Sequence, residues 1–313
     1  MKGDSFYKLN INKNYNFRGI FGIPVTPFNT DDSLDKKSLE KIIHFTIENG
    51  CNGIVMPVMA SEYQTLTDLE RKTIIKKTVQ ITNTRIPVVA GVTGNSNFHS
   101  LELAKFSEDT GVDAIIAMAP FNSPTNFKEI FSFFELLSNN IKIPIFIQNH
   151  SIGTPLNAKE LSMLCEKLDN VKYVKEETKF AGQVSSSLIK KSKRNDCLGI
   201  MSGFSGRFLI NDYKRGICGC MPGSHYGDIH SKIWNLLEQK KEDEAREIYN
   251  RLLPLINLEN LYGISIFKEV LVRRGVISGA TVRSPGKILL DKYDYEELKT
   301  LLESISDLFT WKI

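Results

Sequence analysis

Short apolar segments alternate with helix-like segments along most of the chain, and this alternation is the feature that most limits the possible folds. The apolar segments are nearly continuous in hydrophobic residues, which is typical of strands buried on both faces of a parallel sheet. Between them, apolar residues recur with helical spacing, as in Leu39, Ile42, Ile43 and Ile47. The expected strands are residues 19–25, 53–58, 86–92, 113–119, 143–148, 173–175, 198–202 and 216–221.

Eight strand–helix units in succession predict an α/β fold, specifically a (β/α)8 TIM barrel. An open doubly wound sheet is the rival architecture, but no G-x-G-x-x-G follows the first strand. Thr67-x-x-Glu70 and Asn157-x-x-Glu160 are typical of helix starts with a capping side chain.

After Gly223 the strand pattern stops and four helices are expected. The first would close the barrel and the others would form a C-terminal helical appendage. We therefore predict an N-terminal extension over residues 1–18, a barrel over 19–240 and a C-terminal helical region over 241–313. The four expected helices are residues 229–239, 242–256, 262–273 and 293–308.

Charge and cysteine usage narrow the class of partner. Lys+Arg (40) and Asp+Glu (36) nearly balance, which argues against nucleic acid. No apolar stretch has the length of a membrane span or of a signal-peptide core, so we expect a cytoplasmic protein with no membrane contact. The five cysteines are scattered without zinc-site spacing, and we predict no metal.

Lys175 is the only lysine at the end of an expected strand core, in the stretch YVKEET. Chemistry in such barrels lies at the C-terminal ends of the strands. A lysine in an apolar barrel loses hydration, which favours the neutral amine. A neutral amine can attack a ketone and form a Schiff base. The alternative interpretation is a structural lysine paired with Glu176 or Glu177.

Six segments, in order along the chain, carry a resemblance to one family. They are GIPVTPFNTDDSLD, SEYQTLTDLER, IPVVAGVTGNS, YVKEET, GIMSGFSG and GICGCMPG. The chain resembles the dihydrodipicolinate synthase / N-acetylneuraminate lyase family of class I, pyruvate-dependent aldolases. The resemblance identifies Lys175 with the Schiff-base lysine of that family.

The resemblance implies a homotetramer, often a dimer of dimers, with no metal or organic cofactor. It implies a pyruvate-type 2-keto acid bound through the lysine, whose enamine adds to an aldehyde or is released in the reverse reaction. The family's G-T-T-G-E loop holds the substrate carboxylate, and here Ala60, Ser61 and Glu62 would do so, although both threonines are replaced. Ser61 as a local turn cap is the alternative. The last two strand ends line the keto-acid pocket in the family, which predicts substrate contacts at Ser202, Gly203 and Met221.

A second departure lies after strand 4. The family's catalytic tyrosine follows a proline there, and the best match places Phe121 at that position. Phenylalanine cannot transfer a proton. A polar group from elsewhere would have to replace it, the proton would have to move through water, or the usual family reaction is lost. The candidate replacements at the strand ends are Tyr63, Asn122, His225 and Tyr226, and the sequence does not choose among them.

A third departure lies at the end of strand 5, where the family usually has Tyr-Asn-x-Pro. Here the stretch is Gln148-Asn149-His150-Ser151. We expect Gln148 and Asn149 to contact substrate, and His150 to be either a general acid/base or an ordinary loop histidine. The synthase branch also uses an arginine after strand 4 or 5 to hold a second carboxylate, and neither loop contains one.

These departures order the candidate functions. The leading hypothesis is a Schiff-base aldolase or lyase acting on pyruvate or a related 2-keto acid, with a sugar-acid type of substrate. The alternatives are a dihydrodipicolinate-synthase-type condensation, a keto-acid hydratase or dehydratase that uses the same lysine, and a barrel that binds a metabolite without turnover.

Overall fold

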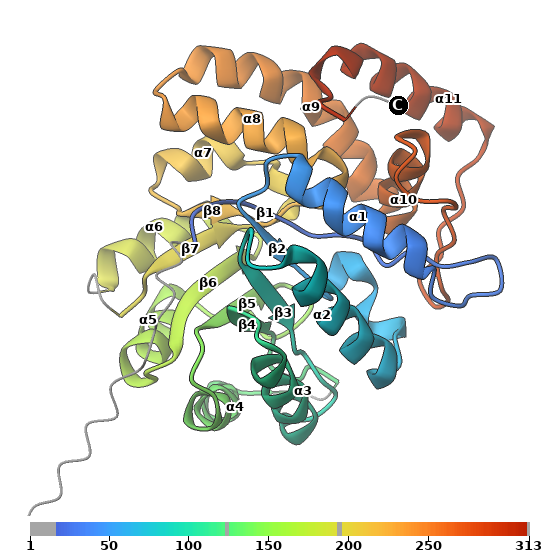
Figure 1. The fold of residues 1–313 in the computed structure, drawn as a ribbon. Helices are drawn as coiled ribbons and strands as arrows, with labels where there is room; N and C mark the ends of the chain where they lie inside the picture. The colour runs from blue at the N-terminus through green and yellow to red at the C-terminus, as the bar shows by residue number, and fades with distance from the viewer. Residues whose placement is uncertain (1–16, 123–124, 193–195, 312–313) are drawn as a thin grey trace, which may run out of the picture.

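Eight parallel strands form a closed barrel in which β8 pairs back to β1 (Figure 1). The structure, a computed structural model, describes residues 17–122, 125–192 and 196–311, so most of the expected N-terminal extension lies outside it. The predicted (β/α)8 TIM barrel is confirmed. The strands are β1 (Gly19–Gly22), β2 (Gly53–Val55), β3 (Val88–Gly91), β4 (Ala114–Ala117), β5 (Ile145–His150), β6 (Val171–Glu177), β7 (Gly199–Ser202) and β8 (Gly219–Cys220).

Helices follow the strands and cover the outside of the barrel. The helix starts predicted at Thr67 and Asn157 are both confirmed as capping boxes with Glu70 and Glu160. The helices of the barrel are α1 (Lys36–Glu48), α2 (Asp68–Thr82), α3 (Asn97–Thr110), α4 (Phe127–Asn140), α5 (Ala158–Lys167), α6 (Ala181–Lys191), α7 (Leu209–Lys214) and α8 (Gly227–Glu238).

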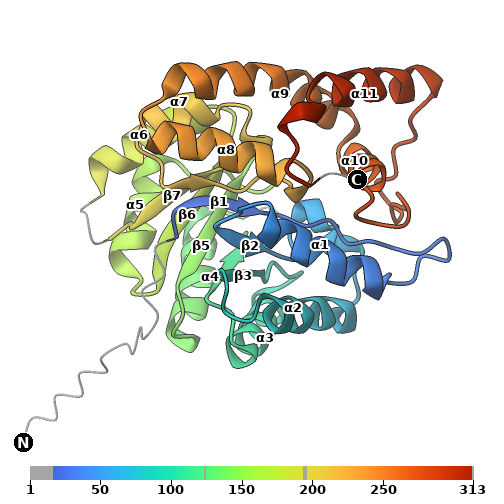
Figure 2. The same ribbon diagram turned by 45° about the horizontal axis from the view of Figure 1, so that its top comes forward.

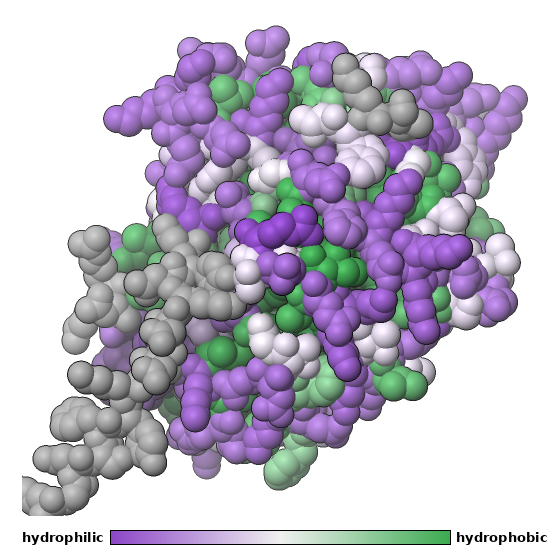
Figure 3. Space-filling view, viewed as in Figure 1, coloured by the Kyte–Doolittle hydropathy of each residue, from purple (hydrophilic) through white to green (hydrophobic). Residues whose placement is uncertain are grey.

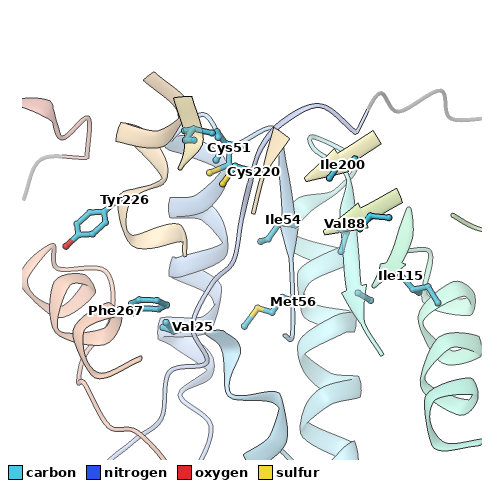
Figure 4. Packing of buried hydrophobic residues seen from close by; sticks show 14 of the residues in the cluster. Val25, Cys51, Ile54, Met56, Val88, Ile115, Ile200, Cys220, Tyr226 and Phe267 are labelled. Atoms are coloured by element: carbon cyan, nitrogen blue, oxygen red, sulfur yellow. The ribbon is translucent and has the colours of Figure 1, made fainter. Parts of the chain in front are cut away.

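Two hydrophobic layers result from the alternation of side chains along each strand. Residues such as Ile54, Val88 and Ile115 point outward and pack under the helices (Figure 4). Inside the barrel, the rings of Phe146 and Tyr173 stack at 4.5 Å, and Phe17 meets both edge-on. We call these three residues the aromatic floor, because they fill the barrel toward the N-terminal ends of its strands.

The chain continues past the barrel into α9 (Glu242–Tyr262), α10 (Ile264–Arg273) and α11 (Lys292–Ser304). α9 packs along α8, and α10 and α11 pack against α9 (Figures 1 and 2). Gly263, with φ +55°, separates α9 from α10, so the helix expected over 262–273 begins two residues later. The face shown in Figure 3 is mostly hydrophilic around its periphery. Within the described residues, no helix combines the length and hydropathy needed to cross a bilayer.

A buried ion pair attaches the C-terminal region to the barrel. Arg274, directly after α10, contacts both carboxylate oxygens of Asp228 in α8, at 2.6 and 3.1 Å. Its guanidinium also lies 4.8 Å from the ring centre of Phe45 in α1 and 4.1 Å from that of Phe309. Both charged side chains are almost fully buried, so each is the counter-charge that makes burial of the other tolerable.

We expect Arg274→Met to destabilise the protein by about 3–5 kcal/mol, because the substitution leaves the Asp228 carboxylate buried without its counter-charge. Arg273→Met is the matched control, since Arg273 lies next to it at the end of α10 but is only partly buried. The control should cost less than about 1 kcal/mol. Urea unfolding followed by circular dichroism measures both, and equal losses would contradict the assignment.

A second ion pair joins the C-terminal region to the start of α2. Arg283 contacts both carboxylate oxygens of Glu70 at 2.6 and 2.9 Å, and its backbone N–H donates to Glu62. The Arg283 hydrogen bonds lower the pKa of Glu70 to about 2, although partial burial acts in the opposite sense. A carboxyl whose pKa falls on folding contributes stability above its ordinary pKa and loses it as the pH falls toward the lowered value.

Glu70→Gln should therefore lower the melting temperature at neutral pH, while the difference from the parent protein shrinks as the pH falls from about 5 to about 3. Glutamine keeps the reciprocal cap with Thr67, so the pH-dependent part reports the charge. Glu102→Gln, which removes an exposed ion pair with Lys72, should change little at any pH. A Glu70→Gln difference that stays constant with pH would show that the charge contributes nothing.

Candidate active site

Lys175 projects into the barrel from β6 at the level of the strand ends. It lies in register with Gln148 of β5 and Met201 of β7. Tyr173, two residues earlier on the same face, belongs to the aromatic floor, so Lys175 lies in the next layer above it. The Lys175 side chain is 4% exposed. An amine in this position has little bulk water around it and is open to chemistry only through the barrel mouth.

β6 is longer than the expected strand and continues two residues past Lys175 to Glu177. Because side chains alternate along a strand, Glu177 shares the inner face with Lys175, whereas Glu176 faces the helices. The Glu177 carboxylate lies 2.9 Å from the Lys175 amine. The pairing of Lys175 with a neighbouring glutamate, which was the alternative interpretation of the sequence, is therefore present, and its partner is Glu177.

The surroundings of Glu177 lower the pKa of its carboxyl. Burial alone raises the pKa of a carboxyl, but the charges of Lys175 and His150 outweigh it, and the pKa of Glu177 lies below its ordinary value. Gln148 donates a hydrogen bond of 3.0 Å to the same oxygen that contacts Lys175. The amide of Gln148, which stands where the family has a tyrosine, thus holds the carboxylate in place.

His150 faces the same interior, in register with Glu177. The backbone N–H of Ile152 donates to its Nδ1 at 2.9 Å, so a neutral ring carries its proton on Nε2. Burial lowers the pKa of His150, Lys175 lowers it further, and Glu177 acts in the opposite sense. Of the strand-5 residues singled out in the sequence, Gln148 and His150 therefore lie beside the lysine.

Asn149 and Ser202 face the other way. The Asn149 side chain bonds to the backbone of Leu156 on both sides and donates to Glu176 at 2.7 Å. Ser202, in register with Glu176, donates to Asp212 of α7 at 2.6 Å. Both were expected to contact substrate. The structure instead uses their polar groups to hold the strand ends against the surrounding helices.

Ser61 lies in the short 3₁₀ turn Met59–Ser61 that follows β2. Its hydroxyl is fully buried and donates to the Pro24 carbonyl at 2.7 Å. The backbone N–H groups of Ser61 and Glu62 donate to Val58 and Met59 within the turn. The Ser61 hydroxyl therefore joins this turn to the segment after β1, so it is not the local turn cap of the alternative interpretation. Ala60 is half-buried in the same turn.

Glu62 completes that turn in a left-handed conformation, with φ +56°. Its carboxylate pairs with Lys268 of α10, and both side chains are almost fully buried. Burial raises the pKa of Glu62, although Lys268 acts against it. The expected contact of Glu62 with substrate is thus replaced by a contact with the C-terminal region.

Phe121 is 38% exposed and lies on the wall of a cavity of about 290 Å³ that neither Lys175 nor Glu177 lines. Tyr63 and Asn122 line the same cavity together with Arg71 and His99. The cavity is built from the segments after β2, β3 and β4, whereas the lysine and its partners belong to β5 and β6.

The remaining two replacement candidates, His225 and Tyr226, are buried near the C-terminal helices. His225 bonds to Glu259 of α9 at 2.8 Å, and its ring lies 4.4 Å from that of Tyr226. None of the four residues proposed as replacements for the tyrosine is paired with Lys175.

The end of β7 approaches the pair directly. A Cβ on Gly203 would lie 2.1 Å from Cγ of Glu177, so only glycine leaves room for that side chain. The next residue, Phe204, adopts φ +50° and donates its backbone N–H to Glu177 at 3.3 Å. Met221, after β8, packs inside the barrel with Met201.

The sequence left open whether Glu176 or Glu177 pairs with Lys175, because the expected strand ended at Lys175. Continuing the period of two would have placed Glu177 on the face of Lys175. Arg207 was not singled out in the sequence. Arg207, after β7, lies with its guanidinium 4.7 Å from the ring centre of Phe204. The ring of Phe204 in turn lies 6.2 Å from that of His150.

The site within the described residues contains an amine, a carboxylate and an imidazole, but no group of three or more His, Cys, Asp or Glu placed to bind a metal ion. These three groups suffice for nucleophilic and acid–base steps at a carbonyl carbon.

The sequence of this chain matches one protein family and several of its members. The model of the dihydrodipicolinate synthetase family matches residues 16–305. A 4-hydroxy-tetrahydrodipicolinate synthase of Clostridium novyi is 32% identical over 245 residues, which are 77% of this chain and 81% of that protein. An uncharacterised DapA-like lyase of Thermococcus onnurineus is 27% identical over 92% of this chain and 99% of its own.

A solved structure has the same fold over nearly the whole chain. A prophage protein of E. coli K12, belonging to the dihydrodipicolinic acid synthase family and solved in complex with pyruvate, superposes with a TM-score of 0.86. It is 22% identical and covers 93% of this chain and 99% of its own. With the family match over most of its length, the chain belongs to the dihydrodipicolinate synthetase family, a family of class I aldolases and lyases.

Proposed function

We propose that this protein is a Schiff-base-forming aldolase or lyase that acts on pyruvate or a related 2-keto acid through Lys175. The observation that carries the proposal is the position of the amine, which lies inside the barrel at the strand ends with a carboxylate at 2.9 Å. The neutral amine attacks the C2 carbonyl and water leaves. The resulting iminium accepts the electrons of the C3–C4 bond when that bond breaks, which leaves an enamine and releases the aldehyde.

The partner of the enamine is proposed to be a small aldehyde derived from a sugar acid. The polar groups that support this choice are the Gln148 amide and the His150 imidazole, which line the mouth on the β5 side. Both can hydrogen-bond to hydroxyl groups, as the hydroxyls of a sugar acid require. The segments after β4 and β5 contribute no arginine, which disfavours a substrate with a second carboxylate at that place.

Condensation of pyruvate with aspartate semialdehyde, as in a 4-hydroxy-tetrahydrodipicolinate synthase, is the second candidate. Two observations favour it: the name carried by the Clostridium novyi relative and the position of Arg207, whose guanidinium stacks on Phe204 at the mouth. In this case Arg207 would hold the second carboxylate from β7 instead of from β4 or β5.

Incubation with pyruvate and borohydride should reduce the Schiff base to a stable adduct that peptide mapping assigns to Lys175. Lys175→Met should abolish the adduct. Lys172→Met is the matched control, because Lys172 lies on the same strand but faces outward by alternation and is only partly buried. An adduct that survives Lys175→Met, or a panel of 2-keto acids that leaves Lys175 unmodified, refutes the proposal.

Product analysis separates the remaining possibilities. We expect pyruvate to be released from 3-deoxy-2-keto sugar acids faster than it is consumed with aspartate semialdehyde. Arg207→Met should leave the sugar-acid reaction within about threefold of the parent rate. If aspartate semialdehyde is instead the better partner and Arg207→Met slows that reaction on the order of 10-fold or more, the second candidate is correct, since a charged hydrogen bond contributes about 1.5–3 kcal/mol.

Two other outcomes would assign a different activity. Loss of water with the carbon skeleton retained would identify a hydratase or dehydratase. An adduct on Lys175 without turnover of any substrate would identify a metabolite-binding barrel. The homotetramer stays a prediction from resemblance, and light scattering coupled to size-exclusion chromatography tests it.

A further inference from the structure

The carboxylate of Glu177 is held against the Lys175 amine by several independent contacts. One oxygen contacts the Lys175 amine at 2.9 Å and accepts from the Gln148 amide at 3.0 Å. The other accepts from the backbone N–H of Phe204 at 3.3 Å. β5, β6 and β7 each contribute one of these contacts. The carboxylate is therefore fixed by three neighbouring strands of the barrel or the segments that follow them.

The backbone after β7 is shaped around this carboxylate. A side chain at Gly203 would overlap Glu177, with an added Cβ only 2.4 Å from its Oε1. Phe204 and Ser205 adopt φ +50° and +53°, conformations that non-glycine residues rarely take. Strained backbone of this kind persists where the surrounding structure enforces it. Here the conformation aims the Phe204 N–H at Glu177.

Apart from the His150 imidazole, which lies in register with Glu177 on β5, the neighbours of the amine cannot exchange protons near neutral pH. Gln148 and Met201 lie in register with Lys175 on the two adjacent strands, and neither an amide nor a thioether titrates there. Phe121, at the position matched to the family's tyrosine, lies on another cavity. Schiff-base formation requires protons to leave the nitrogen and to reach the departing oxygen. Within the described residues, Glu177 is the titratable group in contact with Lys175.

We propose that Glu177 is the proton-transfer residue of Lys175 during formation and hydrolysis of the Schiff base. This inference rests on the proposed function of Lys175 and adds a catalytic residue to it. In this proposal Glu177 transfers the proton that the family's catalytic tyrosine would transfer. It lies on the same strand as Lys175, two residues further along the inner face.

The steps balance with this one group. The Glu177 carboxylate takes a proton from the Lys175 ammonium, and the neutral amine attacks the C2 carbonyl. The Glu177 carboxylic acid then protonates the new alkoxide, which gives a carbinolamine with a charged nitrogen. Glu177 takes a second proton from that nitrogen and delivers it to the hydroxyl, which leaves as water. The product is a protonated iminium, and Glu177 is again an anion.

The test is the rate of borohydride trapping with pyruvate in Glu177→Gln, compared with the parent protein. Glutamine keeps the size and the capacity to accept hydrogen bonds but cannot transfer the proton. We expect trapping to slow on the order of 10²-fold, in the lower part of the range for general acid–base catalysis, with the adduct still on Lys175. The matched control is Glu176→Gln, the adjacent buried carboxyl that faces the helices, and its rate should stay within about threefold of the parent rate.

The direction of the change separates this role from a structural one. If Glu177 only held the ammonium, its removal would favour the neutral amine and trapping would be unchanged or faster. That result, with the adduct on Lys175, would overturn the inference while leaving the proposed function intact. Failure of the parent protein to trap any 2-keto acid would instead overturn the proposed function.

A second pair of variants keeps the test decisive if circular dichroism shows that Glu177→Gln does not fold. Glu177→Asp retains a carboxylate that is one methylene shorter, and Glu177→Ala removes it. We expect the aspartate variant to trap at least roughly tenfold faster than the alanine variant, because a misplaced carboxylate still transfers protons. Equal rates for these two variants would contradict a proton-transfer role.

Discussion

The positive charge of Lys175 is the constraint on which the mouth of this barrel depends. The interior below it is filled by the aromatic floor and by apolar side chains, which cannot solvate an ammonium. A buried charge of this kind requires a counter-charge with further hydrogen bonds, because the loss of hydration otherwise exceeds the electrostatic gain. Glu177 is that counter-charge. Its carboxylate also accepts hydrogen bonds from the Gln148 amide and from the backbone N–H of Phe204, and it leaves no room for a side chain at Gly203. The ion pair of Lys175 thus connects β6 to β5 and to the backbone after β7.

The alternation of side chains divides the polar residues at the strand ends into two sets. Lys175, Glu177, Gln148 and His150 belong to the inner set and surround the amine. Glu176, Asn149 and Ser202 belong to the outer set and bond to loops and helices. The two sets alternate residue by residue, so the outer contacts fix the backbone that carries the inner groups. Chemistry placed on strands in this way is held more rigidly than chemistry placed on loops, which is what proton transfer over a hydrogen-bond distance requires.

The sequence was sufficient for the barrel because buried parallel strands and amphipathic helices leave strong periodic patterns, and Thr67 and Asn157 even marked two helix starts correctly. It also pointed to Lys175, since a charged residue ending an apolar strand is unusual. It did not give the roles of Glu62, Asn149 or Ser202, because their partners Lys268, Leu156 and Asp212 are set by tertiary packing. Phe121 was aligned by its neighbours in the chain, whereas the structure places it on a cavity that Lys175 does not line.

A second buried ion pair, Glu62–Lys268, lies on the β2 side of the barrel mouth. Glu62 ends the turn after β2, yet its carboxylate is neutralised by Lys268 of α10 and receives the backbone N–H of Arg283. The C-terminal region therefore contacts the β2 side of the mouth. The amine, the carboxylate and the imidazole of the candidate site lie on the opposite side, on β5 and β6. Burial already raises the pKa of Glu62, and removing Lys268 would take away the charge that opposes this rise, so Glu62 would take up a proton or the turn would open toward water. The appendage after the barrel is thus joined to the wall opposite the lysine by a buried ion pair and a backbone hydrogen bond.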